Sequence, residues 1–225
     1  MGRRSARFSL RERQDGKWSS ISRAPIIPAD GTWHHRDMER GPTIETDRLL
    51  LRRWRESDLA PFAAMNADPE VMEYFPGALD RDRSDALARA ADDSFEQNGY
   101  GLWAVQVKDG EPFIGFVGLH HVSNDIPVRG STEVGWRLAR SAWGKGYAPE
   151  AAQAGLSFGF EKCGLGEIVS FTSLLNERSQ RVMQKIGMHT DPADDFEHTS
   201  LDPGHPLRHH VLYRLTAEEW RAVAG

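Results

Sequence analysis

The chain has 225 residues, of which 39% are hydrophobic, and a formal net charge of −5. This length suits one domain of about 180 residues with an extension, and the negative charge excludes the global basic field that is typical of nucleic-acid-binding proteins. No apolar run approaches the roughly 18 residues of a membrane span. The single cysteine, Cys163, cannot form an internal disulfide, which fits a reducing cytoplasm.

Residues 1–42 differ from the rest of the chain. They contain several prolines and glycines and show little periodic hydrophobicity, so we expect them to be mostly disordered. Their arginines have no apolar core behind them, which excludes a secretory signal. Met38 is a candidate native initiator; the alternatives are a dispensable segment or a basic arm that contacts ribosomal RNA or an acidic partner. The folded domain is expected at residues 43–220.

Hydrophobic periodicity predicts the elements of the first half. In chain order they are a strand with its lead-in at 43–52, a helix at 56–67, a loop at 74–77, a helix at 81–97, and strands at 102–107 and 113–121. The Asp68-Pro69 step ends the first helix, and Gly99 closes the second. Asp109-Gly110 predicts a tight hairpin between the two strands.

The second half is expected to alternate strands and helices. In chain order they are a strand at 132–139, a helix at 147–162, a strand at 168–172, a helix after Asn176, a strand at 209–215 and a short tail helix. In the first of these strands, Val134, Trp136 and Leu138 share one face, while Glu133, Gly135 and Arg137 share the other. Hairpins followed by a strand–helix–strand unit imply a mixed sheet flanked by helices.

The segment Trp143-Gly144-Lys145-Gly146-Tyr147-Ala148 connects a predicted strand to a predicted helix. Two glycines let the backbone curl tightly and approach a ligand closely. The first amides of the helix have no internal partner, and the helix dipole adds positive potential there. Pro149 suits the first helical turn. These features predict an anion site, most often for phosphate; the alternative is an ordinary glycine-rich turn.

The spacing discriminates among phosphate-binding turns. A Walker A loop needs Ser or Thr after its lysine, whereas Gly146 follows Lys145, and a dinucleotide fingerprint needs a third glycine where Pro149 stands. The segment instead resembles the Gln/Arg-x-x-Gly-x-Gly/Ala signature of the GNAT N-acetyltransferase superfamily. Trp143, Gly146 and Ala148 occupy its defined positions. Trp143 stands where Gln or Arg is usual, a departure that resembles the ribosomal-protein-alanine acetyltransferase branch.

A second motif strengthens this resemblance. Asn176-Glu177-Arg178-Ser179, followed by residues 182–188, is similar to the Asn-x-x-Ser and Lys-x-Gly-Phe/Met pattern of the same branch. The resemblance assigns Asn176 to the pantetheine arm of coenzyme A and Ser179 to the neighbourhood of its sulfur. From the residues alone, Asn176 is a good N-cap for the Ser179 amide, and Gly187 is a good C′ residue. The two interpretations are compatible.

Residues 45–52 resemble a phrase that opens many members of this branch, so the likeness covers about residues 43–216. It implies a single α/β (mixed α+β) domain, with a central, mostly antiparallel mixed sheet that is splayed at the acetyl-CoA site and flanked by helices. It also implies that the glycine turn holds the pyrophosphate. The expected coenzyme A contacts are Leu138, Ala139, Arg140, Trp143, Gly144, Lys145, Gly146, Tyr147, Ala148, Asn176 and Ser179.

The resemblance implies that an amine attacks the acetyl thioester directly in a ternary complex. The amine must be neutral, so a base has to take its proton, and a backbone N–H from residues 134–138 is expected to stabilise the oxyanion. The leaving thiol, with a pKa of roughly 8.5, needs no strong acid. Ser179 is the candidate for a hydrogen bond to the sulfur.

Glu133 is the leading candidate for the base. The alternatives for Glu133 are a solvated residue or an ion pair with Arg137. His120 and His121 are rivals because imidazole titrates near neutrality, and strand alternation is expected to put only one of them on the cleft side. For Glu150, in the first helical turn, complementing the helix dipole is the simplest role.

Residues 191–210 hold several Asp, Glu and His side chains among prolines. They lack the paired spacing of zinc motifs, so no metal is expected. The segment is either an acidic loop that attracts a cationic amine at the acceptor site or a solvated surface loop.

We therefore expect a cytoplasmic, acetyl-CoA-dependent N-acetyltransferase whose acceptor is a primary amine on a small molecule or a protein N-terminus. No membrane or nucleic-acid partner is expected, and a homodimer through the late strands, common among similar proteins, stays open. One alternative is a non-catalytic acyl-CoA-binding sensor or partner module. Another is a nucleotide-binding protein that uses the same turn. Nothing in the sequence identifies the acceptor.

Overall fold

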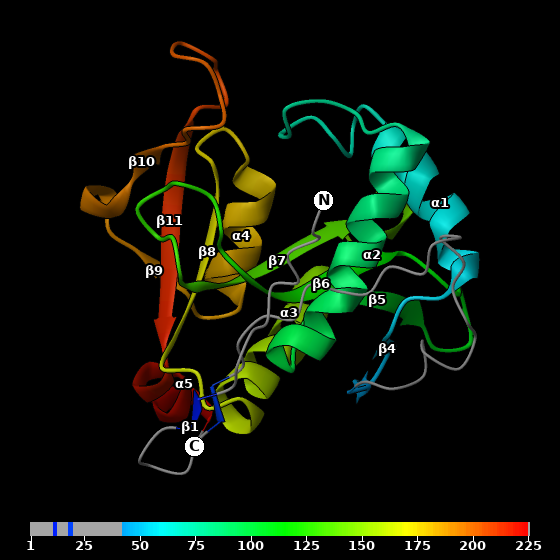
Figure 1. Cartoon of the computed structure of the whole chain (residues 1–225), viewed down its shortest axis with the longest axis horizontal. Helices are drawn as coiled ribbons and strands as arrows, with labels where there is room; N and C mark the ends of the chain where they lie inside the picture. Colours follow the sequence, from blue (N-terminus) through cyan, green and yellow to red (C-terminus); the bar gives the residue numbers. More distant parts are fainter. Residues whose placement is uncertain (1–10, 13–17, 20–41, 225) are drawn as a thin grey trace, which may run out of the picture.

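A nine-stranded sheet organises the chain (Figure 1). The computed structural model describes residues 11–12, 18–19 and 42–224. The strand order is β10-β11-β8-β7-β6-β5-β4-β3, with β9 also paired to β11. The strands are β3 (Ile44–Glu45), β4 (Leu49–Arg52), β5 (Leu102–Val107), β6 (Gly115–His121), β7 (Thr132–Leu138), β8 (Glu167–Ser173), β9 (His189–Thr190), β10 (Phe196–Glu197) and β11 (His209–Thr216).

The prediction of disorder for residues 1–42, with Met38 as candidate initiator, falls almost entirely outside the described residues. Within that stretch, β1 (Arg11–Glu12) and β2 (Trp18–Ser19) pair with each other in antiparallel fashion.

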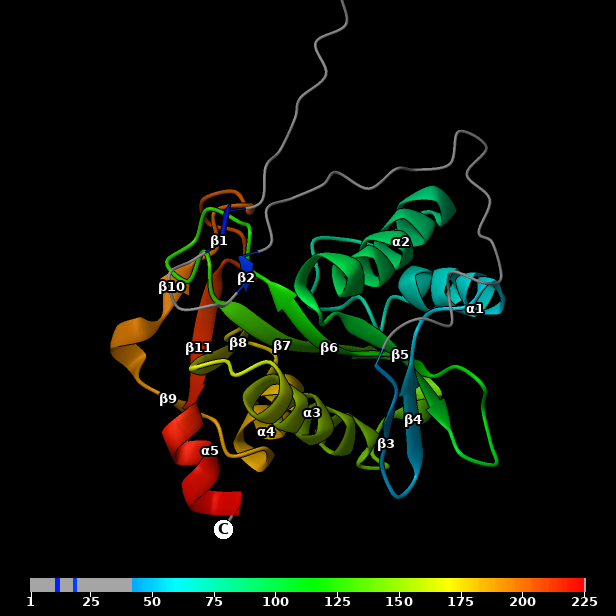
Figure 2. The same ribbon diagram turned by 60° about the horizontal axis from the view of Figure 1, so that its bottom comes forward.

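Helices cover both faces of the sheet (Figure 2). They are α1 (Glu56–Ala67), α2 (Arg81–Asn98), α3 (Tyr147–Ser157), α4 (Glu177–Lys185) and α5 (Ala217–Ala224), with 3₁₀ turns at Arg140–Ala142 and Pro192–Asp194. On one face, α1 and α2 bury a cluster that includes Trp54, Phe62 and Phe116. On the other, α3 and α4 bury a larger one around Leu156 and Met183. None of the helices described here is both long and apolar enough to cross a membrane.

The sheet separates in its middle, between β7 and β8. These two strands run parallel and pair at a single position, where Glu133 lies opposite Val169. By contrast, β7 pairs with β6, and β8 pairs with β11, each in antiparallel fashion over seven positions. After Glu133 the two strands diverge (Figure 1). The predicted mixed, mostly antiparallel and splayed sheet is confirmed.

The predicted elements of the described region are present, with small differences at their ends. Residues 43–52 form two short antiparallel strands in place of one, because Ile44 pairs with Leu51. β6 begins at Gly115, two residues later than predicted, since the connection before it is held as a loop: the Arg52 Nη2 donates to the Pro112 carbonyl at 2.7 Å. The helix predicted at 147–162 changes into a π-helical turn over its last five residues, Phe158–Lys162.

Two buried ion pairs fix α1 and α2 to the end of β4. Arg52 donates from Nη1 and Nη2 to the Asp58 carboxylate at 2.7 and 2.9 Å. Arg53 donates from Nε and Nη2 to Asp92 at 2.5 and 2.7 Å. All four side chains are buried, and their bidentate geometry offsets the desolvation of the charges. The ion pairs set the position of α2 and of the loop that follows α1, which form one wall of the site.

Candidate active site

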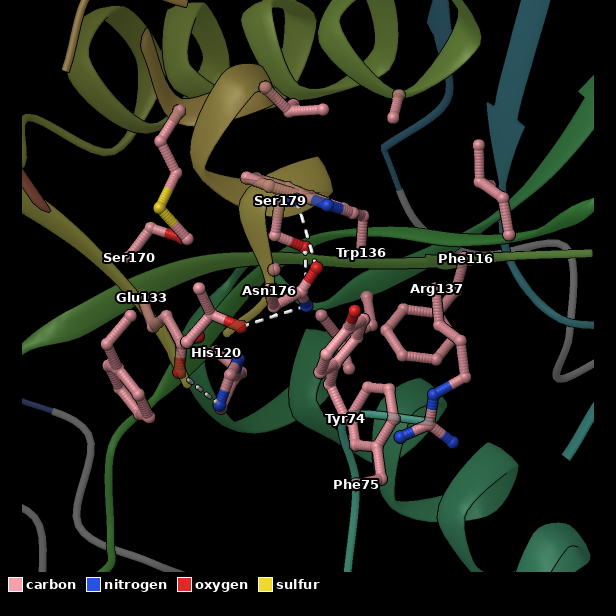
Figure 3. A pocket seen from close by; sticks show the side chains of 18 of the residues that line it. Tyr74, Phe75, Phe116, His120, Glu133, Trp136, Arg137, Ser170, Asn176 and Ser179 are labelled. Carbon is pink, nitrogen blue, oxygen red and sulfur yellow. Dashed lines mark hydrogen bonds and ion pairs between the residues drawn. The ribbon is translucent and has the colours of Figure 1, made fainter. Parts of the chain in front are cut away.

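A cavity of about 2010 Å³ opens where β7 and β8 diverge. Figure 3 shows part of its lining. The walls come from the loop after α1, from α2, β6, β7 and β8, and from the starts of α3 and α4. The sequence-predicted residues that line it are Glu133, Leu138, Trp143, Gly144, Gly146, Tyr147, Ala148, Asn176 and Ser179. Ala139, Arg140 and Lys145 are not part of the lining.

The glycine turn presents a run of free amides to this cavity. Gly144 and Gly146 have φ of 74° and 79°, a left-handed conformation that costs glycine little. Within the described chain, the backbone N–H groups of residues 144–148 have no hydrogen-bond acceptor. Gly146 is the N-cap of α3, so the positive end of the helix dipole lies at the same place. Successive free amides at a helix N-terminus form an anion-binding site.

A carboxylate from α3 ties this turn to the start of the domain. Glu150 accepts hydrogen bonds from the Thr46 hydroxyl at 2.6 Å and from the Arg48 Nε at 2.6 Å. Arg48 in turn donates to the Lys145 carbonyl at 2.9 Å, and its guanidinium lies 4.9 Å from the centre of the Tyr147 ring. Burial alone would raise the pKa of Glu150, but these hydrogen bonds lower it below its usual value. Glu150 thus orients the turn, a role beyond complementing the helix dipole.

Trp143, which replaces the usual Gln or Arg of the signature, packs against the guanidinium groups of two arginines. Its indole N–H donates to the Leu138 carbonyl at 2.8 Å. The guanidinium of Arg140 lies 5.0 Å from the ring centre and that of Arg178 lies 4.5 Å from it. Two glutamates of the loop after α1 pair with these arginines, Glu70 with Arg140 at 2.6 Å and Glu73 with Arg178. Positive charge is therefore supplied beside the turn although the signature side chain itself is neutral.

Asn176 acts as the predicted N-cap of α4 and orients Ser179. Asn176 Oδ1 accepts from the Ser179 backbone N–H at 3.2 Å, and its Nδ2 donates to the Ser179 hydroxyl at 3.1 Å and to the Thr172 hydroxyl at 3.0 Å (Figure 3). Both amide hydrogens of Asn176 are used, so one lone pair of its Oδ1 is left for a ligand. Since the Ser179 oxygen accepts, its own hydrogen is free to donate into the cavity.

Backbone groups of β7 become free where β8 leaves it. The Ser170 hydroxyl donates to the Val134 carbonyl at 2.8 Å, so the backbone of Val134 faces β8. Alternation along a strand makes Trp136 and Leu138 face the same way. Because β8 pairs with β7 only at Glu133, the N–H groups of Trp136 and Leu138 have no partner in β8. They are suitable donors for a developing oxyanion.

Glu133, which is buried, and His120, whose side chain is 39% exposed, form a pair in the cavity. Glu133 Oε2 lies 3.2 Å from His120 Nε2. Burial raises the pKa of Glu133 to about 8, partly offset by a hydrogen bond from the Phe171 backbone. Burial, with a smaller contribution from His121, lowers the pKa of His120 to about 4. The geometry alone would describe an ion pair, but both shifts favour the neutral forms, because desolvation outweighs the attraction between charged partners here.

Two expectations about this strand region are corrected. Glu133 makes no ion pair with Arg137, whose Nη1 donates instead to the Asn66 Oδ1 at 2.7 Å. Both His120 and His121 line the cavity, although only one was expected to reach it. The rim of the cavity is wide enough to include the exposed end of β6. Of the two histidines, His120 alone contacts Glu133.

The late segment reaches the cavity through different residues from those expected. His198, Leu201 and His210 line it, and burial lowers the pKa of His210 to about 4. The carboxylates expected to attract an amine are paired elsewhere, Asp194 with Arg214 at 2.7 Å and Glu197 with Arg208 at 3.0 Å. Among the residues that the structure describes, no group of three or more His, Cys, Asp or Glu side chains is placed to hold a metal ion.

A free-amide turn and a splayed parallel strand pair within one cavity are the features that the sequence motifs implied. The family model described as "Acetyltransferase (GNAT) domain" matches residues 48–189. The chain belongs to the GNAT acetyltransferase family. It is an N-acetyltransferase, and GNAT enzymes use acetyl-CoA and an amine acceptor.

Relatives of this GNAT enzyme cover most of its described domain. The chain is 34% identical to the uncharacterized protein YkkB of Bacillus subtilis (strain 168) over 147 residues, 65% of this chain and 84% of YkkB. It is 30% identical to the FsC-acetyl coenzyme A-N(2)-transacetylase of Aspergillus fumigatus over 186 residues, 80% of this chain and 78% of that one. A GNAT-family acetyltransferase from Bacillus anthracis superposes with a TM-score of 0.65 at 26% identity, covering 79% of this chain and all of its own.

Several residues that build the GNAT site were missed by sequence reasoning. Asn66 and Phe75 contact Arg137 from α1 and from the loop after it. Arg48 orients the glycine turn from the start of the domain. The phrase at residues 45–52 was the available signal for Arg48. No local pattern marks Asn66 or Phe75.

Proposed function

We propose that this GNAT enzyme transfers the acetyl group of acetyl-CoA to a primary amine by direct attack in a ternary complex. The observation that carries the proposal is the placement of the free-amide turn, through Gly144, Gly146, Tyr147 and Ala148, and the buried carboxyl of Glu133 in one cavity. The first is a site for the pyrophosphate of coenzyme A. The second has a pKa of about 8 and, in its ionised form, can accept a proton from an ammonium substrate.

Acetyl-CoA supplies the acetyl thioester; the side chains supply positioning and proton transfer. Glu133 takes a proton from the ammonium, so the neutral nitrogen has a lone pair with which to form the new N–C bond. The N–H groups of Trp136 and Leu138 stabilise the carbonyl oxygen while it is negative. As the C–S bond breaks, the Ser179 hydroxyl donates a hydrogen bond to the sulfur. The nitrogen's second proton ends on the departing sulfur, so the products are an amide, the free thiol and the one proton that Glu133 accepted.

The glycine turn and the cations around Trp143 form the coenzyme A side of the cavity in this proposal. Gly144 and Gly146 let the backbone approach the pyrophosphate. Arg140 and Arg178 now pair with glutamates and can pair with phosphate oxygens when coenzyme A binds. The Trp-Gly-x-Gly-Tyr-Ala form of the turn supports membership of the ribosomal-protein-alanine branch. The acceptor is a small-molecule amine or a protein N-terminus, and the enzyme acts in the cytoplasm.

Labelled acetyl transfer tests the proposal. Isotope-labelled acetyl-CoA is added to a size-fractionated cell extract with the enzyme, and mass spectrometry locates the label. Label on a small amine or a protein N-terminus, absent with Glu133→Gln, supports the proposal and names the acceptor. Tight binding of acetyl-CoA with no label in any fraction contradicts it and supports the sensor alternative.

A further inference from the structure

Arg137 lies on the cavity-facing side of β7, away from the Glu133–His120 pair. It is four residues beyond Glu133, about 13 Å along the strand at about 3.3 Å per residue. The two ends are separate in Figure 3, with Asn176 and Ser179 between them. The guanidinium lies 4.0 Å from the centre of the Phe75 ring and 5.6 Å from that of Phe116.

The charge of Arg137 has no counter-ion within the described residues. No carboxylate oxygen lies within 4.0 Å of its nitrogens, whereas Arg52 and Arg53, buried in the same half of the domain, each hold an aspartate in two hydrogen bonds. Burial lowers the pKa of Arg137 to about 10, so it is still a cation at neutral pH. Arg137 is half-buried, with its Nε out of contact with solvent. Removing a cation from water without an anion beside it is costly, and two phenyl faces with one amide oxygen offset only part of that cost.

The free donors of Arg137 have the geometry of a carboxylate receptor. Its Nη1 is used by the Asn66 Oδ1, while Nε is buried without any hydrogen-bond partner. Nη2 also has no acceptor among the described residues. Nε and Nη2 share one edge of the guanidinium plane, the edge on which a carboxylate binds through two parallel hydrogen bonds. The residue lines the cavity, so this edge belongs to the space where the acceptor has to bind.

We propose that Arg137 determines acceptor specificity by binding a carboxylate of the acceptor, so that the substrate is a primary amine whose carboxylate lies many bonds away, far enough to reach Arg137 while the amine is at Glu133, as in a short peptide. The inference rests on the proposed function, because it names the substrate class of the same site. It disfavours polyamines, which carry no anion. Asn66 and Phe75 hold the guanidinium in place and are positioning residues.

Matched acceptors test the inference. Initial rates of thiol release are measured with a panel of short peptides that end in a free carboxylate and with the corresponding C-terminal amides, which keep the amine and lose the charge. The wild type is expected to prefer the acid by about 10- to 100-fold in kcat/KM, the loss that follows from removing charged hydrogen bonds. Arg137→Gln is expected to remove that preference by lowering only the rate with the acid. Arg129→Gln, an exposed arginine outside the cavity lining, is the control and is expected to keep the preference.

Equal losses of rate with acids and amides in Arg137→Gln would mean a structural role and would overturn the inference. A wild type that prefers the amides would overturn it too. In that case the enzyme still acetylates amines, so the proposed function stands while the inference fails.

A binding assay tests the case in which the proposed function fails but the inference about Arg137 holds. N-acetyl derivatives of the same short peptides and of their C-terminal amides are titrated into the coenzyme A-loaded protein by calorimetry, which needs no turnover. Acid-selective binding that Arg137→Gln removes, with no amine acetylated in the first assay, would support the inference and contradict the proposed function. No acid-selective signal in either assay would overturn the inference.

Discussion

The carboxyl of Glu133 and the Nε2 of His120 lie 3.2 Å apart at the position where β7 and β8 stop pairing. Because burial raises the pKa of Glu133 to about 8 and lowers that of His120 to about 4, the pair is uncharged at neutral pH. At neutral pH the proton of the pair lies on Glu133. Glu133 can therefore act as a base only after it has lost this proton and become a carboxylate.

We expect kcat/KM to rise with pH and to inflect near about 8, because Glu133 accepts a proton only in its ionised form. Glu133→Gln is expected to lower the rate by roughly 100-fold or more, the usual contribution of a positioned base, while acetyl-CoA affinity is kept. Rates of thiol release across this pH range measure both effects. The acceptor amine also titrates, but its inflection persists in the variant, so the two can be separated. An unchanged profile in Glu133→Gln would transfer the role to His120 or to water.

The same pair predicts how stability depends on pH. The folded-state pKa of Glu133, about 8, exceeds the ordinary value of 4.5 for a glutamate, so the folded protein binds the proton more tightly and loses stability as pH rises between these values. His120, lowered from 6.5 to about 4, acts in the opposite direction, but only below its unfolded value of 6.5. Between pH 6.5 and about 8, the Glu133 effect stands alone.

Glu133→Gln is therefore expected to gain stability relative to the wild type as pH rises from 6.5 to about 8. The gain is bounded by about 1.4 kcal/mol for each pKa unit crossed. Denaturant unfolding at several pH values measures it. A constant difference between the two proteins over this interval would contradict the raised pKa.

Gly146→Val is expected to weaken coenzyme A binding at least 10-fold, because a branched side chain at this turn blocks the approach of an anion to the backbone. The substitution also strains a residue with φ of 79°, and its Cβ would lie 3.3 Å from the Arg48 Nη2. Gly164→Val is the matched control, since Gly164 has a similar φ of 66°, open surroundings and no place in the cavity lining. Both variants are expected to lose about 1–2 kcal/mol of stability.

Calorimetric titration with coenzyme A distinguishes the two effects of Gly146→Val. Loss of affinity in Gly146→Val but not in Gly164→Val assigns the turn to the ligand. Equal coenzyme A affinity in the wild type and both variants would contradict the assignment of this turn to the pyrophosphate.

The parts of the site that the sequence predicted are those built from neighbouring residues. The glycine turn and the Asn176–Ser179 cap follow from backbone rules that act within one turn of chain. Strand alternation alone put Glu133 on the face opposite Val134, and the structure has Glu133 in the cavity lining. These predictions needed no knowledge of which strands are neighbours.

The parts that the sequence could not predict depend on long-range packing. The contact between Arg48 and Glu150 joins residues 102 positions apart, and either side chain alone is an ordinary exposed charge. An ion pair between Arg137 and Glu133 was one of the alternatives because both lie on one strand face, but the Arg137 guanidinium contacts Asn66 and Phe75 instead. Such choices are made by partners from other elements, so no local periodicity encodes them.

Ser179→Ala is expected to lower kcat by roughly 5- to 10-fold and to leave coenzyme A affinity nearly unchanged. The reason is that a hydroxyl is a weak acid, so its hydrogen bond to the departing sulfur contributes about as much as an ordinary hydrogen bond. The N-cap survives, because Asn176 Oδ1 accepts from the backbone N–H of residue 179, which alanine retains. Ser157→Ala, which removes a hydroxyl from α3 outside the cavity lining, is the control. Single-turnover kinetics isolate the chemical step; abolished activity would make Ser179 an obligatory acid, and an unchanged rate would remove it from the reaction.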